Sequence, residues 1–381
     1  MRAPRAGLVL LLLLVVPLTA CGGKTEKPLQ IGAVVAELRD VELQNDAIDL
    51  MRGMGLADVA RVDAAWRRGQ TTMDSGERSD IRDGIDKATA AGIDVYLSLY
   101  PGGSSQTPMT DRDRADFASW VVDAVKAMPN LHHVIIGNEP NLNLFWMPQF
   151  GASGQDLAAA GYERLLARTY DAVKQVAPKV EVLGGALAHS GTDKPGTDRD
   201  THSPGRFILD LGAAYRASHR TKPIMDAFTY HPYMERSDLP PTLRHRRSKT
   251  LTIADYPRLV SYLGRAFDGT GQKGADIPIV YDEFGVEAKI PPTRASEYRG
   301  REPASTHPVS ERTQAEYYAD AFRLASCQPT VRAIMIFQLV DSPMRSSFQS
   351  GVVYADRSAP RSGAAEIADA AARYRERKNC G

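Results

Sequence analysis

Two apolar segments of the sequence each end in a glutamate. Glu139 ends the run VIIGNE at 134–139 and is followed by a proline, and Glu283 ends the run IVYDE at 279–283. Because proline cannot continue a hydrogen-bonded ladder, we expect Glu139 at the C-terminal end of its strand. In a pair of carboxyl groups, one can be protonated and act as an acid while the other attacks or activates water. The two glutamates are therefore the candidate catalytic residues, and cleavage of a glycosidic bond is the chemistry that such a pair suits.

Eight short β-rich runs alternate along the chain with longer stretches of helical periodicity. The expected strands are 31–35, 59–62, 95–99, 134–137, 180–183, 227–230, 279–282 and 333–337, and the expected helices include 47–54, 117–128, 161–175, 256–267, 312–325 and 364–375. This alternation predicts a single-domain (β/α)8 TIM barrel, an α/β fold. Strands four and seven of such a barrel lie nearly opposite, so both glutamates would lean over one cavity. The irregular segments 191–204, 233–252 and 289–309 all follow strand ends, where barrel loops build the active site.

The motif Asn138-Glu139-Pro140 at the end of the fourth strand and Glu283 at the end of the seventh resemble glycoside hydrolase clan A, particularly families five and thirty-nine. The resemblance covers roughly residues 31–374 at the level of strand order. It implies that Glu139 is the general acid/base, Glu283 the nucleophile and Asn138 the amide that hydrogen-bonds the sugar 2-hydroxyl. It also implies a double displacement that retains anomeric configuration and needs no cofactor or metal.

Three further residues at strand ends resemble the partners of that pair. His231 and Tyr233, which end the sixth strand, resemble the partners of the nucleophile, and a hydroxyl or imidazole bonded to a carboxylate lowers its pKa. Arg61, near the end of the second strand, resembles an arginine that helps to keep the nucleophile ionised. A buried structural histidine and a surface charge are the alternative interpretations of His231 and Arg61.

Aromatic and amide residues near these strand ends are candidates for sugar binding. Trp146 follows the fourth strand and Trp66 follows the second. An exposed ring at either place would stack on a sugar, and core packing is the alternative. Tyr281 shares strand parity with Glu283 and is expected to point into the barrel below it. Clan members often carry a tryptophan at the end of strand eight, whereas this run reads MIFQLVD at 335–341. Gln338 would hydrogen-bond where that ring stacks, which leaves the sugar and the retention of activity open.

The first residues resemble a bacterial export signal. A basic start is followed by an apolar stretch at 8–18 and by the sequence LTAC at 18–21, which resembles a lipobox with Cys21 as the lipidated residue. An ordinary signal peptide with a chance cysteine is the alternative. We therefore expect a signal peptide at 1–21, a tether at 22–29 and the barrel domain at 30–381, in an extracytoplasmic protein that is lipid-anchored to the bacterial cell membrane.

Composition argues against several other classes of protein. The formal net charge is +1, with 47 basic and 46 acidic residues, so the chain lacks the basic stripe of a nucleic-acid-binding protein. The basic run 244–249 is the exception and is expected to be a solvated loop. The remaining cysteines, Cys327 and Cys380, suggest a disulfide in an exported chain and leave no cysteine cluster for zinc. The expected partner is a poly- or oligosaccharide, with membrane contact through the lipid anchor only and a monomeric chain.

Two other functions compete with the glycosidase. The first is a catalytically inactive, carbohydrate-binding lipoprotein on the same barrel, because a fold does not decide function. The second is a cell-envelope enzyme that acts on a non-sugar ester or lipid, for which a Ser-His-Asp arrangement would be expected. The sequence contains no Gly-x-Ser-x-Gly elbow.

Overall fold

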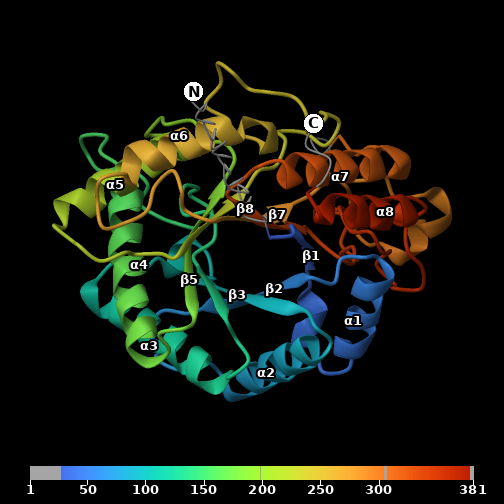
Figure 1. Ribbon diagram of the computed structural model, residues 1–381, viewed down its shortest axis with the longest axis horizontal. Helices are drawn as coiled ribbons and strands as arrows, with labels where there is room; N and C mark the ends of the chain where they lie inside the picture. Colours follow the sequence, from blue (N-terminus) through green and yellow to red (C-terminus); the bar gives the residue numbers. More distant parts are fainter. Residues whose placement is uncertain (1–26, 198, 304–306, 378–381) are drawn as a thin grey trace, which may run out of the picture.

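Eight parallel strands close into a barrel in the order of the sequence. The structure is a computed structural model that describes residues 27–197, 199–303 and 307–377. Figure 1 shows the helices arranged as a ring around these strands. The strands are β1 Gln30–Val34, β2 Val59–Trp66, β3 Asp94–Pro101, β4 His133–Ile136, β5 Glu181–Ala188, β6 Ala227–His231, β7 Ile279–Phe284 and β8 Val331–Ile336. The predicted (β/α)8 barrel is confirmed.

Each strand is followed by a helix that covers the outer face of the barrel. The helices are α1 Gln44–Gly53, α2 Ser75–Ala90, α3 Asp111–Ala127, α4 Leu157–Val176, α5 Pro204–Ala217, α6 Tyr256–Phe267, α7 Glu311–Ser326 and α8 Ala364–Arg375. Short 3-10 helices lie in the loops as η1 Ala36–Arg39, η2 Ser104–Gln106, η3 Ile253–Asp255 and η4 Pro292–Glu297. Among the described residues, no helix is both long enough and apolar enough to cross a bilayer.

Two of these helices, α2 and α5, were not expected from the sequence. The buried stripe of α2 consists of only four residues, Ile81, Gly84, Ile85 and Ala88, in an otherwise polar segment. Its start is fixed instead by Asp74, whose side chain accepts hydrogen bonds from the backbone N–H groups of the first turn. Helix α5 begins at Pro204, a residue that suits the first turn of a helix because its missing N–H has no partner there. Helix α3 begins with a capping box, in which the Thr110 side chain accepts from the Asp113 N–H and the Asp113 side chain accepts from the Thr110 N–H.

The core has two layers, one inside the barrel and one between the barrel and the helices. The inner cluster fills the barrel with side chains from alternate strand positions, namely Val59, Tyr96, Ile135, Leu183, Ala186, Ala227, Val280, Ala333 and Met335. The outer cluster is larger and joins the outward faces of the strands to the apolar stripes of the helices. Because the barrel interior is packed, the site must lie above it, at the C-terminal ends of the strands.

An ionic network closes the opposite, N-terminal end of the barrel. His133 lies with Nδ1 2.9 Å from Glu181 and Nε2 2.8 Å from Asp94. Arg332 donates to both carboxylate oxygens of Glu181, at 3.1 and 2.5 Å. Burial works against ionisation of Glu181, but the hydrogen bonds from His133 and Arg332 outweigh it and lower the pKa to about 2. This network ties β3, β4, β5 and β8 together.

The lowered pKa of Glu181 predicts a loss of stability in acid. A carboxyl whose pKa is depressed in the folded state stabilises it above the ordinary value of 4.5, and this contribution is lost as the pH falls toward about 2. We expect Glu181→Gln to lower the melting temperature at pH 6 and to reduce its decline between pH 5 and pH 2.5, measured by circular dichroism. Glu42→Gln, at an exposed side chain, is the control. Identical pH dependence in wild type and Glu181→Gln would contradict the assignment.

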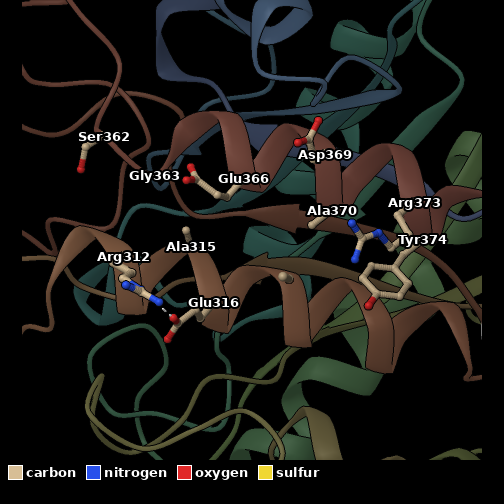
Figure 2. A pocket seen from close by; sticks show the side chains of 11 residues that line it. Arg312, Ala315, Glu316, Ser362, Gly363, Glu366, Asp369, Ala370, Arg373 and Tyr374 are labelled. Atoms are coloured by element: carbon tan, nitrogen blue, oxygen red, sulfur yellow. Dashed lines mark hydrogen bonds and ion pairs between the residues drawn. The ribbon is translucent and has the colours of Figure 1, made fainter.

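A cavity on the outer wall lies between α7 and α8. It has a volume of about 620 Å³. Figure 2 shows its lining, in which Arg312 and Glu316 form an ion pair near Ala315, while Ala370 lies on α8 near Arg373. None of the predicted site residues lines this cavity.

Candidate active site

Glu139 is presented by an unusual backbone conformation just past β4. Gly137 has a φ of 95° and Glu139 itself a φ of 41°, which is rare for a residue with a side chain. The Glu139 N–H donates to the carbonyl of Ala186, at 2.7 Å, and the Glu139 carbonyl accepts from Leu142, at 2.9 Å. These bonds hold the chain in a tight turn, so the strained conformation is fixed by neighbouring structure. Such strain is typical of functional residues. The Glu139 carboxyl lies 3.0 Å from Nδ1 of His231.

Glu283 reaches the same space from β7 through an irregularity in that strand. Val280 packs inside the barrel and Asp282 contacts Arg61 there, so regular alternation would turn Glu283 outward. The register between β7 and β8 shifts between Tyr281 and Phe284, which resets the alternation. The result is that Asp282 and Glu283 both contact Arg61.

The prediction for Tyr281 is wrong for the same reason. Tyr281 was expected to share parity with Glu283 and to point into the barrel below it. Instead it belongs to the outer core cluster, is 1% exposed and donates its hydroxyl to Gln328, at 2.6 Å. The irregularity in β7 separates the directions of the two side chains, so Tyr281 is a packing residue and does not line the site.

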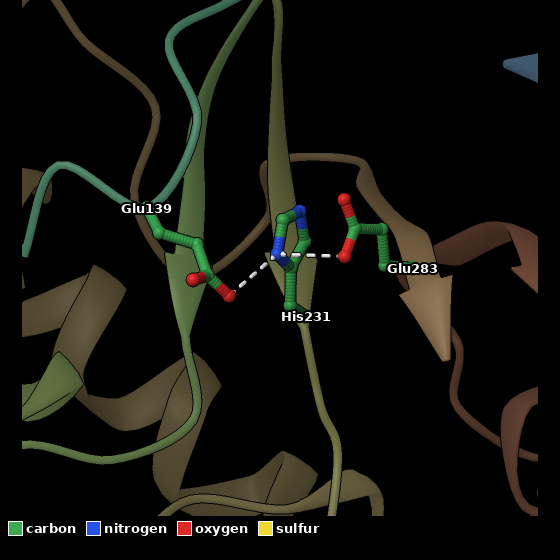
Figure 3. Close-up of side chains that lie close together, drawn as sticks. All are labelled: Glu139, His231 and Glu283. Carbon is green, nitrogen blue, oxygen red and sulfur yellow. Dashed lines mark hydrogen bonds and ion pairs between the residues drawn. The ribbon is translucent and has the colours of Figure 1, made fainter. Parts of the chain in front are cut away.

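His231, the last residue of β6, lies between the two glutamates. Figure 3 shows its ring nitrogen Nδ1 directed at both carboxyl groups, 3.0 Å from Glu139 and 3.5 Å from Glu283. One oxygen of each carboxyl group and a ring nitrogen of His231 lie within 4.8 Å of one another. The other ring nitrogen, Nε2, is 3.3 Å from Asp282. The histidine is buried, as the structural interpretation predicts, and it also contacts both carboxyl groups, as the functional interpretation predicts.

Arg61 is buried and contacts several residues of the site. Its side chain is 1% exposed, and Nη1 contacts Asp282 at 2.9 Å and Glu283 at 2.8 Å. Nη2 donates to the amide oxygen of Asn138, at 3.2 Å, and Nε donates to Asp63, at 2.8 Å. The alternative of a surface charge is therefore wrong for Arg61. Because the Asn138 oxygen is already bonded, its amide N–H groups remain to donate to a ligand.

The charges of this cluster determine its protonation. Burial by itself would lower the pKa of His231, but the carboxylates of Glu283 and Asp282 outweigh it and raise that pKa to about 10. His231 therefore carries a proton on both nitrogens at neutral pH, which suits its contacts with carboxylates on either side. Burial opposes ionisation of Asp282, but His231 and Arg61 outweigh it and lower its pKa. Asp282 is the fixed anion that holds the two cations in place.

The behaviour of Glu283 differs from the expectation. Burial raises the pKa of Glu283 above its ordinary value, and the charges of Glu139 and Asp282 act in the same direction. His231 and Arg61 lower the pKa of Glu283, as predicted, but they do not outweigh the burial. The cluster therefore favours retention of a proton within the carboxyl pair, as is expected of a buried acid close to a second, partly buried one.

Tyr233 connects the nucleophile candidate to an aromatic cluster. Its hydroxyl donates to Oε2 of Glu283, at 3.0 Å. Its ring lies nearly parallel to Phe284, at a centroid distance of 6.4 Å, and edge-on to Phe337 and Phe348, at 6.5 and 5.8 Å. The packing fixes the direction of the hydroxyl, so Tyr233 can select one oxygen of the carboxylate.

This contact predicts a measurable effect of Tyr233→Phe. The variant keeps the ring and removes one hydrogen bond to the charged form of Glu283, so we expect kcat/KM to fall roughly ten- to hundredfold. The acidic limb of the pH profile should move to higher pH, because loss of a bond to the charged form raises the pKa. Tyr230→Phe is the control, since the Tyr230 hydroxyl donates to the Leu251 carbonyl outside the site. An unchanged pH profile for Tyr233→Phe would argue against this role.

Gln338, just past the end of β8, was expected to take the place of an aromatic ring, but the structure has a ring next to it. The peptide bond between Phe337 and Gln338 is cis, and the half-buried ring of Phe337 faces Tyr233. The amide of Gln338 lies 3.5 Å from the carbonyl of Phe348. An aromatic ring is therefore present beside the site, supplied by Phe337, and Gln338 is directed toward the loop of Phe348.

Trp146 and Trp66 are core residues. Trp146 is 3% exposed, packs edge-on against Tyr162 and contacts Gly161, so its face is not available for a sugar. Trp66 is fully buried, packs edge-on against Phe117 and donates its indole N–H to the carbonyl of Gln70. The prediction of Trp146 as a sugar-binding residue is wrong, because the turn after Glu139 directs the ring inward against α4.

Sequence reasoning missed four residues of the cluster. Asp282 directly precedes Glu283 but is not among the residues that the resemblance implies. Asp63 shares parity with Arg61 on β2, which is a signal that was available. Tyr100 lies one residue beyond the predicted end of the third strand and is half-buried; burial raises its pKa, and so do the charges of Asp63 and Glu283. Phe337 directly precedes Gln338, and an aromatic residue at this strand end was a signal that the sequence offered.

The cluster is better suited to proton transfer than to metal binding. Glu139, His231 and Glu283 are the one group of three His, Cys, Asp or Glu residues, among those that the structure describes, with atoms close enough to share an ion. However, both nitrogens of His231 are protonated over most of the pH range, since its pKa is raised to about 10. A protonated ring nitrogen has no lone pair to offer a metal.

The terminal predictions fall largely outside the described residues. Cys21, the predicted signal peptide and most of the tether lie there, as does Cys380. Cys327 is disulfide-bonded. The pairing of Cys327 with Cys380 and the lipidation of Cys21 stay predictions.

The chain matches no protein-family model, and no curated protein matches its sequence. Solved structures do match. A glycoside hydrolase of subfamily GH5_18 from Streptomyces cattleya, in complex with GlcNAc, is 15% identical, with a TM-score of 0.62 over 92% of this chain and 81% of that one. The endo-1,4-β-mannanase of Rhizomucor miehei is 13% identical, with a TM-score of 0.56 over 91% of this chain and 95% of that one.

A GH2 β-galacturonidase from Eisenbergiella tayi, bound to galacturonate, is 13% identical, with a TM-score of 0.55 over 91% of this chain. The match spans about half of that longer protein, 52% of its length. At these identities the likeness establishes the fold, a (β/α)8 barrel, which is shared with glycoside hydrolases of families GH5 and GH2.

Proposed function

We propose that this chain is a retaining glycoside hydrolase in which Glu139 is the general acid/base and Glu283 the nucleophile. The observation that carries the proposal is the pair of carboxyl groups at the ends of β4 and β7. Both contact His231, and one oxygen of each lies within 4.8 Å of the other. Retaining enzymes hold their carboxyl groups about 5–5.5 Å apart, whereas inverting enzymes leave about 6.5–9.5 Å for a water molecule. The spacing therefore favours attack by Glu283 itself.

The reaction begins with Glu283 ionised and Glu139 protonated. An oxygen of Glu283 forms a bond to the anomeric carbon while the glycosidic C–O bond breaks, and Glu139 gives its proton to the leaving oxygen. Glu139, now a carboxylate, then takes a proton from water, whose oxygen attacks the same carbon and releases Glu283. His231, in contact with both carboxyl groups, can strengthen its hydrogen bond to whichever of them is charged.

The electrostatics of the site suit a positively charged transition state. Arg61 and His231 supply two positive charges, while Asp63, Asp282 and the Glu139–Glu283 pair holding one proton supply three negative ones. The net negative charge stabilises an oxocarbenium-like sugar. Asn138 is placed to donate to a sugar hydroxyl beside the nucleophile, because Arg61 holds its amide oxygen.

The remaining parts of the proposal concern location and substrate. We infer from the N-terminal sequence that the protein is exported and attached to the bacterial cell membrane through lipidated Cys21. A poly- or oligosaccharide is the proposed substrate, and the mechanism requires only one chain. No cofactor is needed for the double displacement.

The decisive experiment is covalent trapping. A panel of 2-deoxy-2-fluoro glycosides with good leaving groups should label the protein, and peptide mass spectrometry should locate the sugar on Glu283. Proton NMR during turnover should show the product first in the anomeric form of the substrate. Labelling at another residue, or an inverted first product, would overturn the mechanism. Sugar binding without labelling or turnover would favour the alternative of an inactive carbohydrate-binding protein on this barrel.

A further inference from the structure

A second cavity lies beside the catalytic cluster on the same face of the barrel. It has a volume of about 390 Å³ and lies between the loop that follows β4 and the loop that follows β5. Its lining combines apolar side chains, hydroxyl groups and one guanidinium, from residues Leu142, Asn143, Leu144, Ser190, Thr192, Thr201 and Arg199. Such a mixture of apolar walls and a few polar groups is typical of a ligand site.

The wall of this cavity is built onto the turn that carries Glu139. Buried Asn141 donates from its amide to the carbonyls of Ala188 and His202 and accepts from the Ala188 N–H. Leu142 forms a bridge with Thr201 across the two loops. The cavity is therefore held in a fixed position relative to the acid/base candidate. Because an acid/base protonates the leaving group, a cavity on its side would receive the leaving-group part of a substrate.

Basic residues are in excess in two loops, one that lines the cavity and one that contacts it. Over the described residues of 190–203 and 241–252, five basic side chains have no ion-pair partner in the part of the chain that the structure describes, namely Lys194, Arg199, Arg244, Arg246 and Arg247. The sequence of these two segments contains six basic residues, which include Lys249, against three acidic ones, Asp193, Asp198 and Asp200. Asp193 is paired with Lys249, at 2.9 Å. The whole chain is almost neutral, with 47 basic and 46 acidic residues, so this local excess does not follow from composition.

The basic loop after β6 is tied to the cavity rim. Lys249 donates to the carbonyl of Thr192, a cavity residue, at 3.2 Å, and the Leu251 N–H donates to the carbonyl of His189. Arg258 at the start of α6 donates to the carbonyls of His245, Thr250 and Ser248. The run 244–249 is thus a loop with a fixed backbone. Its arginines are exposed, and because the loop contacts the cavity rim through Lys249, their charge can attract an anion before it binds.

We propose that this cavity binds an acidic sugar, carrying a carboxylate or a sulfate, on the leaving-group side of the cleaved bond. Arg199 would form the direct ion pair, since a guanidinium donates two parallel hydrogen bonds to such a group. The exposed arginines of the run 244–249 would supply the surrounding field. This inference rests on the proposed glycosidase function for the meaning of its position, while the anion site itself does not depend on catalysis.

The test is affinity electrophoresis of the full chain in gels that contain matched polymers. Polygalacturonate and glucuronoxylan are each compared with their carboxyl-reduced forms, and dextran sulfate with dextran. We expect an acidic polymer to retard the protein and its neutral counterpart to do so at least about tenfold less strongly. Retardation by the uronates would identify a carboxylate, and retardation by dextran sulfate alone would identify a sulfate. Equal retardation by acidic and neutral forms, or none by any acidic polymer, would overturn the proposal.

Variants separate the cavity from a general charge effect. Arg199→Gln should weaken retardation by the acidic polymer about tenfold, and Arg246→Gln with Arg247→Gln should weaken it less and mainly at low salt. Arg82→Gln removes an equal charge from the exposed face of α2 and should change nothing. Equal effects of Arg199→Gln and Arg82→Gln would overturn the site. Covalent trapping at Glu283 without a preference for acid would refute only this inference, whereas acid binding through Arg199 without trapping would refute only the glycosidase.

Discussion

Replacement of Glu283 by glutamine should reduce kcat on a cleaved glycan by roughly 10⁴-fold or more, because loss of a nucleophile removes the covalent route altogether. Glutamine keeps the size of the side chain and has one oxygen that can still accept from either Tyr233 or Arg61, which contact the two carboxylate oxygens at 3.0 and 2.8 Å. We therefore expect the fold to persist. The measurement is steady-state turnover of the reducing-end product, together with loss of labelling by the fluorinated glycoside.

The control for this variant is Glu316→Gln on α7, which alters an exposed ion pair with Arg312. It should leave kcat within about twofold of wild type, because exposed pairs contribute little. Full turnover by Glu283→Gln would show that the nucleophile is assigned wrongly. A similar loss in Glu283→Gln and Glu316→Gln would point to a failure of folding, which a melting curve would reveal.

Replacement of Glu139 by alanine should have an effect that depends on the leaving group. For a sugar leaving group, which needs a proton, we expect kcat/KM to fall roughly 10²- to 10⁴-fold. For a dinitrophenyl glycoside, whose leaving group needs no proton, kcat/KM should fall much less, while kcat falls because water is no longer activated. Azide, a nucleophile that needs no base, should restore kcat and yield a glycosyl azide of retained configuration.

The contrast between leaving groups distinguishes catalysis from structure. Glu139 lies in a strained turn, so alanine in its place could alter the backbone, but a structural defect would slow both classes of substrate alike. The control variant is Glu139→Gln, which keeps the side-chain length and should show the same dependence on the leaving group. If azide has no effect on Glu139→Ala with the dinitrophenyl substrate, Glu139 is not the acid/base.

The order of elements was readable from the sequence because a parallel barrel repeats one local pattern. Strands buried on both faces appear as continuous apolar runs, and all eight were found close to their observed positions. Helices α2 and α5 were not predicted, because the apolar stripe of α2 is short and α5 begins at a proline, so the local periodicity was weak. Packing against the barrel still stabilises both helices. The placement of Glu139 and Glu283 at strand ends followed from the residue types that terminate each run.

The sequence by itself thus determined the barrel and the two strand ends that carry the carboxyl groups, because both depend on patterns within a few residues. Only the tertiary structure decided which side chains meet there. The irregularity of β7 turns Tyr281 away and Glu283 inward, and the turn after Glu139 buries Trp146. The raised pKa of His231 arises from carboxylates on β7 and on the turn after β4, and the second cavity is formed by two separate loops. Such contacts depend on distances between segments that are remote in the chain, and no local pattern records them.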